Sequence, residues 1–172
     1  MEKKTVRYKW MLYALLMFIS LILETTLLSH IKIFGATPTH LLPYAVAVIA
    51  MLEGTTSGAL AGLFAGVMSD ALLPAADGFY TITFVFCGIL ISFLCNFVFW
   101  KSFWTTLLYL AAAMLVTRIL YYIFFFVIFG KGEVLSLFFT LPAEFLATAI
   151  FAPVIYFLVI KIAKWAGLGE EA

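Results

Sequence analysis

The stretch that decides the fold is 54-GTTSGALAGLFAGVMSDALLPAADG-78, in which a carboxylate follows a long uncharged run of small and apolar residues. Gly58, Gly62 and Gly66 recur at every fourth position, and Asp70 is the next step of the same series. On a helix with 3.6 residues per turn, these positions stay on one narrow face. The pattern therefore predicts a helix with a close neighbour, and the role of the carboxylate at its end needs an explanation.

The surrounding chain has the composition of a membrane protein. Of its 172 residues, 66% are hydrophobic and 11% are charged, against about 45–50% apolar and roughly 25% charged in soluble domains. The mean hydropathy is +1.16. Because the longest polar stretches lie at the two ends, we expect a single integral membrane domain over residues 1–172. The basic start resembles a signal peptide, but no small-residue cleavage site follows, so we expect an uncleaved first span.

Apolar segments long enough to approach the width of a bilayer predict an all-α, polytopic membrane fold of about six helices. The expected spans are 10–29, 41–52, 58–73, 79–100, 103–129 and 140–163. Segment 41–52 would measure only roughly 18 Å as a helix. It is therefore either a short span or a re-entrant piece, and the second alternative requires that protein covers its backbone.

The basic residues predict that both termini are cytoplasmic. With six spans, the inner side holds Lys3, Lys4, Arg7, Lys9, Lys101, Lys161 and Lys164. The outer side holds Lys32 and Lys131. This excess follows the positive-inside rule, and all four tryptophans fall at the predicted inner boundary, where indole rings concentrate.

The glycine series allows two interpretations. Small residues let transmembrane helices approach closely, because lipid provides little drive for helices to associate. The face of Gly58, Gly62 and Gly66 is therefore either a packing surface inside the monomer or a docking face for another subunit.

Four ionisable residues lie inside apolar segments: Glu24, Asp70, Arg118 and Glu144. Charges at this depth are costly and should face the bundle interior, a cavity or an interface. We expect Arg118 to pair with Asp70 or Glu144 in the outer half of the bundle. Such a pair either fixes the order of the helices or forms part of a substrate or proton site.

No motif predicts catalysis, a cofactor or a metal. His30 and His40 stand ten residues apart without a zinc-binding pattern. The chain has no phosphate-binding loop and no nucleophile elbow. The inner basic residues indicate topology and give no sign of nucleic-acid binding.

Several features together resemble the MreD family of bacterial rod-shape-determining membrane proteins. A proline precedes the short second segment, and a glycine-rich third segment ends in an aspartate that is followed by a glycine. These residues are Pro38, Gly58, Gly62, Gly66, Asp70 and Gly78. The resemblance implies a multi-pass protein of the bacterial cytoplasmic membrane, similar in fold to the S components of energy-coupling-factor transporters.

The resemblance also implies a non-enzymatic scaffold of the cell-elongation machinery, or elongasome. Its expected partner is an MreC-like bitopic protein, and its indirect partners are an actin-like filament and the enzymes of lateral peptidoglycan synthesis. No cofactor or nucleic acid is implied.

The alternative is a vitamin-binding S component, which predicts an outward pocket lined by polar and aromatic residues. S components commonly carry an AxxxA face on the first helix. Segment 10–29 has one alanine and no such face, which counts against a transporter. An intramembrane enzyme is the third alternative, but it has no supporting motif.

Overall fold

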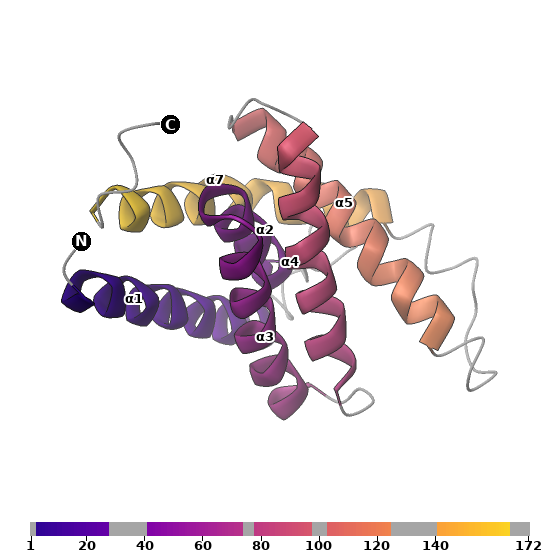
Figure 1. Cartoon of the computed structure of the whole chain (residues 1–172). Coiled ribbons are helices and arrows are strands. Elements are labelled where there is room, and N and C mark those ends of the chain that lie inside the picture. Colours follow the sequence, from indigo (N-terminus) through magenta and orange to yellow (C-terminus); the bar gives the residue numbers. More distant parts are fainter. Residues whose placement is uncertain (1–2, 28–40, 74–77, 98–102, 125–140, 166–172) are drawn as a thin grey trace.

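The computed structural model describes residues 3–27, 41–73, 78–97, 103–124 and 141–165, and every regular element among them is helical (Figure 1). The helices are α1 (Lys3–Ile22), α2 (Leu41–Glu53), α3 (Thr55–Leu72), α4 (Phe79–Phe97), α5 (Phe103–Tyr121) and α7 (Leu141–Trp165). A π-helical turn, η1 (Leu23–Leu27), extends α1. The described residues therefore have the expected all-α fold.

The short helix α2 is the centre of the molecule. It contacts α1, α3, α4, α5 and α7, and all of its residues from Leu41 to Met51 are buried. With 13 residues, it is about 20 Å long, which is less than the roughly 30 Å of a bilayer core. The surrounding helices cover its backbone, as a short intramembrane helix requires.

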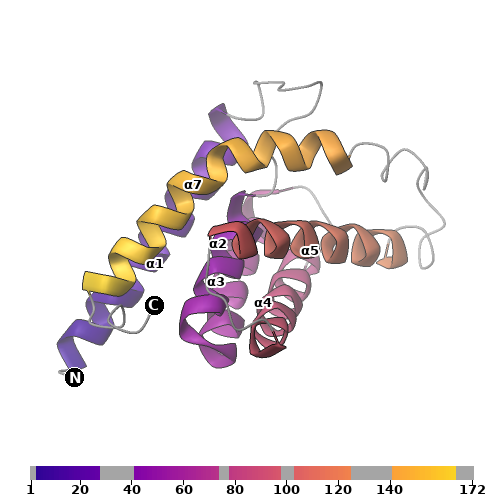
Figure 2. The ribbon, with the colours of Figure 1, turned by 90° about the horizontal axis from the view of Figure 1, so that it is seen from above.

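Four of the other helices form two pairs around α2. α3 and α4 pack side by side, whereas α1 and α7 run alongside each other and cross the first pair steeply (Figure 1). α5 lies across the far side of the molecule, away from α1 (Figure 2). α7 remains helical through Pro153 and changes direction part-way along its length (Figure 2).

Among the residues that the structure describes, three helices are long and apolar enough to cross a membrane: Arg7–Thr26, Trp104–Phe124 and Leu141–Trp165. Leu41–Glu53 and Phe79–Cys95 are shorter apolar helices. The observed limits differ from the predicted spans mainly at the ends. α1 begins seven residues before the predicted start at Trp10, and α3 begins three residues before the predicted start at Gly58.

A buried ionic contact joins α1 to the end of α2. Lys9 Nζ donates a hydrogen bond to Glu53 Oε2 at 2.7 Å, and the Tyr13 hydroxyl donates one to Glu53 Oε1 at 2.6 Å. The Lys9 and Glu53 side chains are only 10% and 4% exposed. Buried charges of this kind need partners, so this contact fixes the position of α1 against the central helix.

Candidate functional site

The candidate site is a cavity of about 350 Å³ at the end of the bundle where α1, α3 and α5 end and α2 and α4 begin. Its polar wall includes Glu24, Thr25, Tyr80, Thr117 and Arg118. The remaining lining residues are mostly apolar or aromatic: Leu21, Leu42, Pro43, Ser69, Leu73, Phe79, Phe84 and Tyr121. A cavity of this size, mostly apolar with a few polar groups, is typical of small-ligand sites.

Asp70 lies beside the cavity and holds the start of α4. Its Oδ1 accepts a hydrogen bond from the Tyr80 N–H at 2.9 Å, and its Oδ2 accepts one from the Thr81 N–H at 3.0 Å. The Thr81 hydroxyl also donates to Oδ2 at 2.6 Å. The first N–H groups of a helix have no partner within the helix. Asp70 therefore acts as a capping carboxylate supplied by the neighbouring helix.

Gly78 explains why this cap comes from another helix. It immediately precedes α4, has φ of +82°, and its carbonyl accepts the Ile82 N–H at 3.1 Å. Positive φ strongly favours glycine. A glycine has no side chain to cap the helix, and Asp70 supplies the missing acceptor.

The three residues of the glycine series pack against other helices of the same molecule. A Cβ added at Gly62 would lie 2.7 Å from the Phe84 carbonyl carbon. A Cβ at Gly66 would lie 2.8 Å from the Thr81 nitrogen, and one at Gly58 would lie 2.6 Å from Ala50 Cβ. Of the two interpretations, the structure supports packing in the monomer. α4 covers this face, and Ala50 of α2 covers it at Gly58, so the three glycines are in contact with helices of the same chain.

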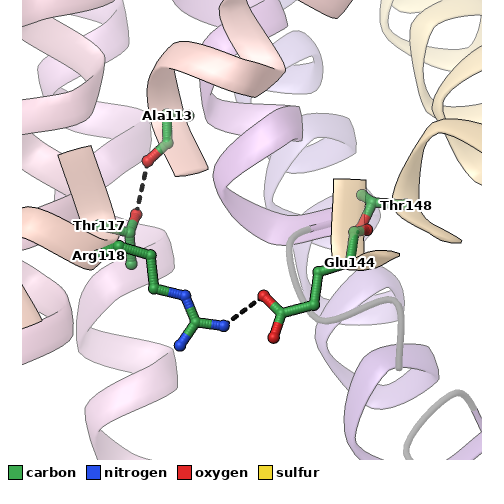
Figure 3. Close-up of polar contacts among 5 residues, drawn as sticks. All are labelled: Ala113, Thr117, Arg118, Glu144 and Thr148. Carbon is green, nitrogen blue, oxygen red and sulfur yellow. Dashed lines mark hydrogen bonds and ion pairs between the residues drawn. The ribbon is translucent and has the colours of Figure 1, made fainter. Parts of the chain in front are cut away.

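Arg118 pairs with Glu144 across α5 and α7, through Nη2 and Oε2 (Figure 3). The two side chains are 17% and 12% exposed. The expected ion pair is therefore present, and Asp70, the other proposed partner, instead caps α4. The neighbouring Thr117 hydroxyl donates to the Ala113 carbonyl at 2.8 Å (Figure 3).

Glu24 lies in η1 and faces the start of the central helix. Its Oε2 accepts a hydrogen bond from the Leu42 N–H at 3.3 Å. A carboxylate at the N-terminus of a helix is stabilised by the helix dipole. The four ionisable residues predicted inside apolar segments thus lie at one end of the bundle: Glu24, Asp70, Arg118 and Glu144. Their hydrogen bonds and ion pair do not join into one network.

Pro38 lies outside the described residues. Lys9, which sequence analysis treated only as an inner basic residue, is a buried partner of Glu53. Gly88 was not among the predicted packing residues, yet a Cβ added there would lie 2.7 Å from the carbonyl carbon of Gly58. A glycine inside the fourth apolar segment was the available signal for this close contact.

Within the described part of the chain, no group of three or more His, Cys, Asp or Glu side chains is arranged to hold a metal ion. The site therefore offers hydrogen-bonding and charged groups on an apolar background. Comparison of the chain with protein-family models, curated proteins and solved structures finds no match.

Proposed function

We propose that this chain is a non-enzymatic, polytopic scaffold of the bacterial cytoplasmic membrane, of the MreD type, which binds the transmembrane helix of an MreC-like bitopic protein. Through that partner it would connect to an actin-like filament and to the enzymes of lateral peptidoglycan synthesis, and so maintain rod shape. The motif residues that carry the resemblance support the proposal. Five of these residues serve the packing or capping of the α3–α4 pair: Gly58, Gly62, Gly66, Asp70 and Gly78.

The proposed topology has six membrane segments, with both termini cytoplasmic. Three long apolar helices and two shorter ones in the described part of the chain account for five of these segments, and α3 is the sixth. The 18-residue α3 connects the Glu53 end of the bundle to the Asp70 end. Polar side-chain contacts occur at both ends, with Lys9 and Glu53 at one and Arg118 and Glu144 at the other.

The observation that carries the partner proposal is a groove between α1 and α7, here called the α1–α7 groove. It has a volume of about 570 Å³ and twelve lining residues, all apolar except Ser20. Leu15 and Ile19 of α1 and Leu23 of η1 line it and are exposed in the monomer. From Leu12 to Leu23 the groove follows about 17 Å of helix, a length that suits the side of a single apolar helix.

Site-directed crosslinking tests this partner site. Ile19→Cys and Val154→Cys would each be paired with cysteines along the transmembrane helix of an MreC-like protein encoded in the same genome. We expect disulfide-linked heterodimers from both positions. Leu108→Cys is the matched control, because Leu108 is exposed on α5, outside the groove. Crosslinks from Leu108 alone, or a complete lack of co-purification, would overturn the proposal.

A second candidate function is a vitamin-binding S component, and the cavity lined by Glu24, Arg118 and aromatic rings favours it. The two functions differ in what the purified protein retains. A scaffold retains the bitopic partner, whereas an S component retains a vitamin and no bitopic partner. Mass spectrometry of the gently purified protein distinguishes them.

A further inference from the structure

The guanidinium of Arg118, which lines the cavity, has a buried N–H group without an acceptor among the described residues. Arg118 lines the cavity and contacts Glu144 through Nη2. Its Nε is buried and has no hydrogen-bond partner among the described residues. Most buried N–H donors are paired with protein or ordered water, and an exception needs an explanation. The guanidinium therefore has donor capacity that Glu144 does not use, and a ligand oxygen in the cavity would accept from it.

The same cavity holds a carboxylate without a cationic partner in the described part of the chain. Glu24 lines the cavity, and its hydrogen bond from Leu42 is long at 3.3 Å. The charge of Arg118 is balanced by Glu144, and Asp70 is held by the N–H groups of α4. Glu24 has only the one long hydrogen bond from Leu42 to offset its charge, whereas Asp70 accepts three.

Glu24 and Arg118 line the same cavity, one from η1 and the other from α5. Tyr80, Phe79 and Phe84 also line the cavity, and aromatic faces stabilise a desolvated ammonium group. A purely anionic ligand would be repelled by Glu24, and a purely cationic ligand would leave the unused donor of the Arg118 guanidinium without an acceptor.

We propose that this cavity binds a zwitterionic group, with an anionic oxygen on the Arg118 guanidinium and an ammonium on Glu24. Two sources carry this chemistry: the headgroup of an aminophospholipid such as phosphatidylethanolamine, and a free amino-acid-like solute. The proposal does not depend on the partner at the α1–α7 groove.

Native mass spectrometry of the full chain in mild detergent tests the proposal. The probes are short-chain phosphatidylethanolamine, short-chain phosphatidylglycerol, a mixture of free amino acids, and succinate. We expect retention of phosphatidylethanolamine or of an amino acid, and much weaker retention of phosphatidylglycerol and succinate. Retention of the lipid identifies a headgroup site, and retention of the amino acid identifies a solute site. Retention of neither, or equal retention of the anionic probes, would overturn the proposal.

Variants connect the binding to the named side chains. Glu24→Gln keeps the shape of the side chain and removes its charge, so we expect roughly tenfold or greater loss of affinity for the retained zwitterion. Thr26→Ser is the control, because Thr26 is in the same turn and does not line the cavity. The double variant Arg118→Met/Glu144→Gln removes the guanidinium without leaving Glu144 charged and unpaired, and it should lose affinity similarly. Unchanged affinity in either folded variant, judged by gel filtration and circular dichroism, would refute the assignment.

Discussion

Asp70 at the end of α3 holds Thr81 in the first turn of α4 through two hydrogen bonds, 3.0 Å from the backbone nitrogen and 2.6 Å from the hydroxyl. The carboxylate is thus a structural acceptor that satisfies groups at the start of a helix. This explains why a charged residue follows the glycine series. The glycines bring α3 and α4 together, and Asp70 fixes the relative position of their ends.

Replacing Asp70 by Asn should destabilise the protein by about 1–2 kcal/mol, because the charge at the helix N-terminus and one good acceptor are lost. The measurement is unfolding by SDS in mixed micelles. Thr81→Val, which removes only the hydroxyl bond, should have a smaller effect. Equal stability of Asp70→Asn and the unmodified protein would contradict the capping role.

Gly62→Ala should destabilise the α3–α4 pair, because the new Cβ would lie 2.7 Å from the Phe84 carbonyl carbon and 2.9 Å from Val85 Cα. Overpacking of this kind costs about 1–3 kcal/mol, and Gly62→Leu should prevent folding. Ala71→Leu is the control, since Ala71 is exposed on the same helix. Thermal unfolding followed by circular dichroism provides the comparison. If Gly62→Ala and Ala71→Leu were equally stable, the close approach would be disproved.

Removing one member of the Arg118–Glu144 pair should cost more than removing both. A buried charge left alone destabilises by up to about 3–5 kcal/mol, whereas neutral replacement of a whole pair is often tolerated. We therefore expect Arg118→Met to be less stable than Arg118→Met/Glu144→Gln. The SDS unfolding assay measures the coupling in a double-mutant cycle. Purely additive effects would show that the two residues do not interact.

The contacts of Lys9 and Tyr13 with Glu53 predict that substitutions at these two α1 positions reduce stability to different extents. Lys9→Met leaves the buried Glu53 carboxylate without its cation and should destabilise strongly, whereas Tyr13→Phe removes one hydrogen bond, worth about 1 kcal/mol. Arg7→Met is the matched control, because Arg7 is exposed on the same helix. Limited proteolysis of purified protein should detect release of α1 in Lys9→Met alone. Cleavage of Arg7→Met at the same rate would rule out a specific role for Lys9.

The length of the apolar segments was sufficient to predict the helices, because it depends on local composition. The glycine series also predicted a close helix pair. The same information could not determine rotation about each helix axis. For this reason Arg118 had two possible partners in the sequence, and only the packing of α5 on α7 selects Glu144.

Contacts between distant residues were the part that sequence patterns did not reveal. Lys9 and Glu53 are 44 residues apart in the sequence. Lys9 belongs to the basic N-terminal segment and Glu53 to a polar turn, and neither segment indicates the other as a partner. The cavity likewise takes its wall from the ends of several helices. Its existence depends on how those ends meet, and no single segment carries a signal for it.

The last prediction concerns α3, which the proposed topology requires to cross the membrane. Thr56 and Leu72 are exposed near opposite ends of this helix, about 24 Å apart along its axis. In a Cys87→Ala/Cys95→Ala background, Leu72→Cys should react with a membrane-impermeant maleimide in intact cells. Thr56→Cys should react only after permeabilisation, and Leu63→Cys, exposed in mid-helix, should stay unlabelled because a thiolate does not form in lipid. Labelling of both end positions from the same side would show that α3 is re-entrant, and the reverse pattern would invert the proposed orientation.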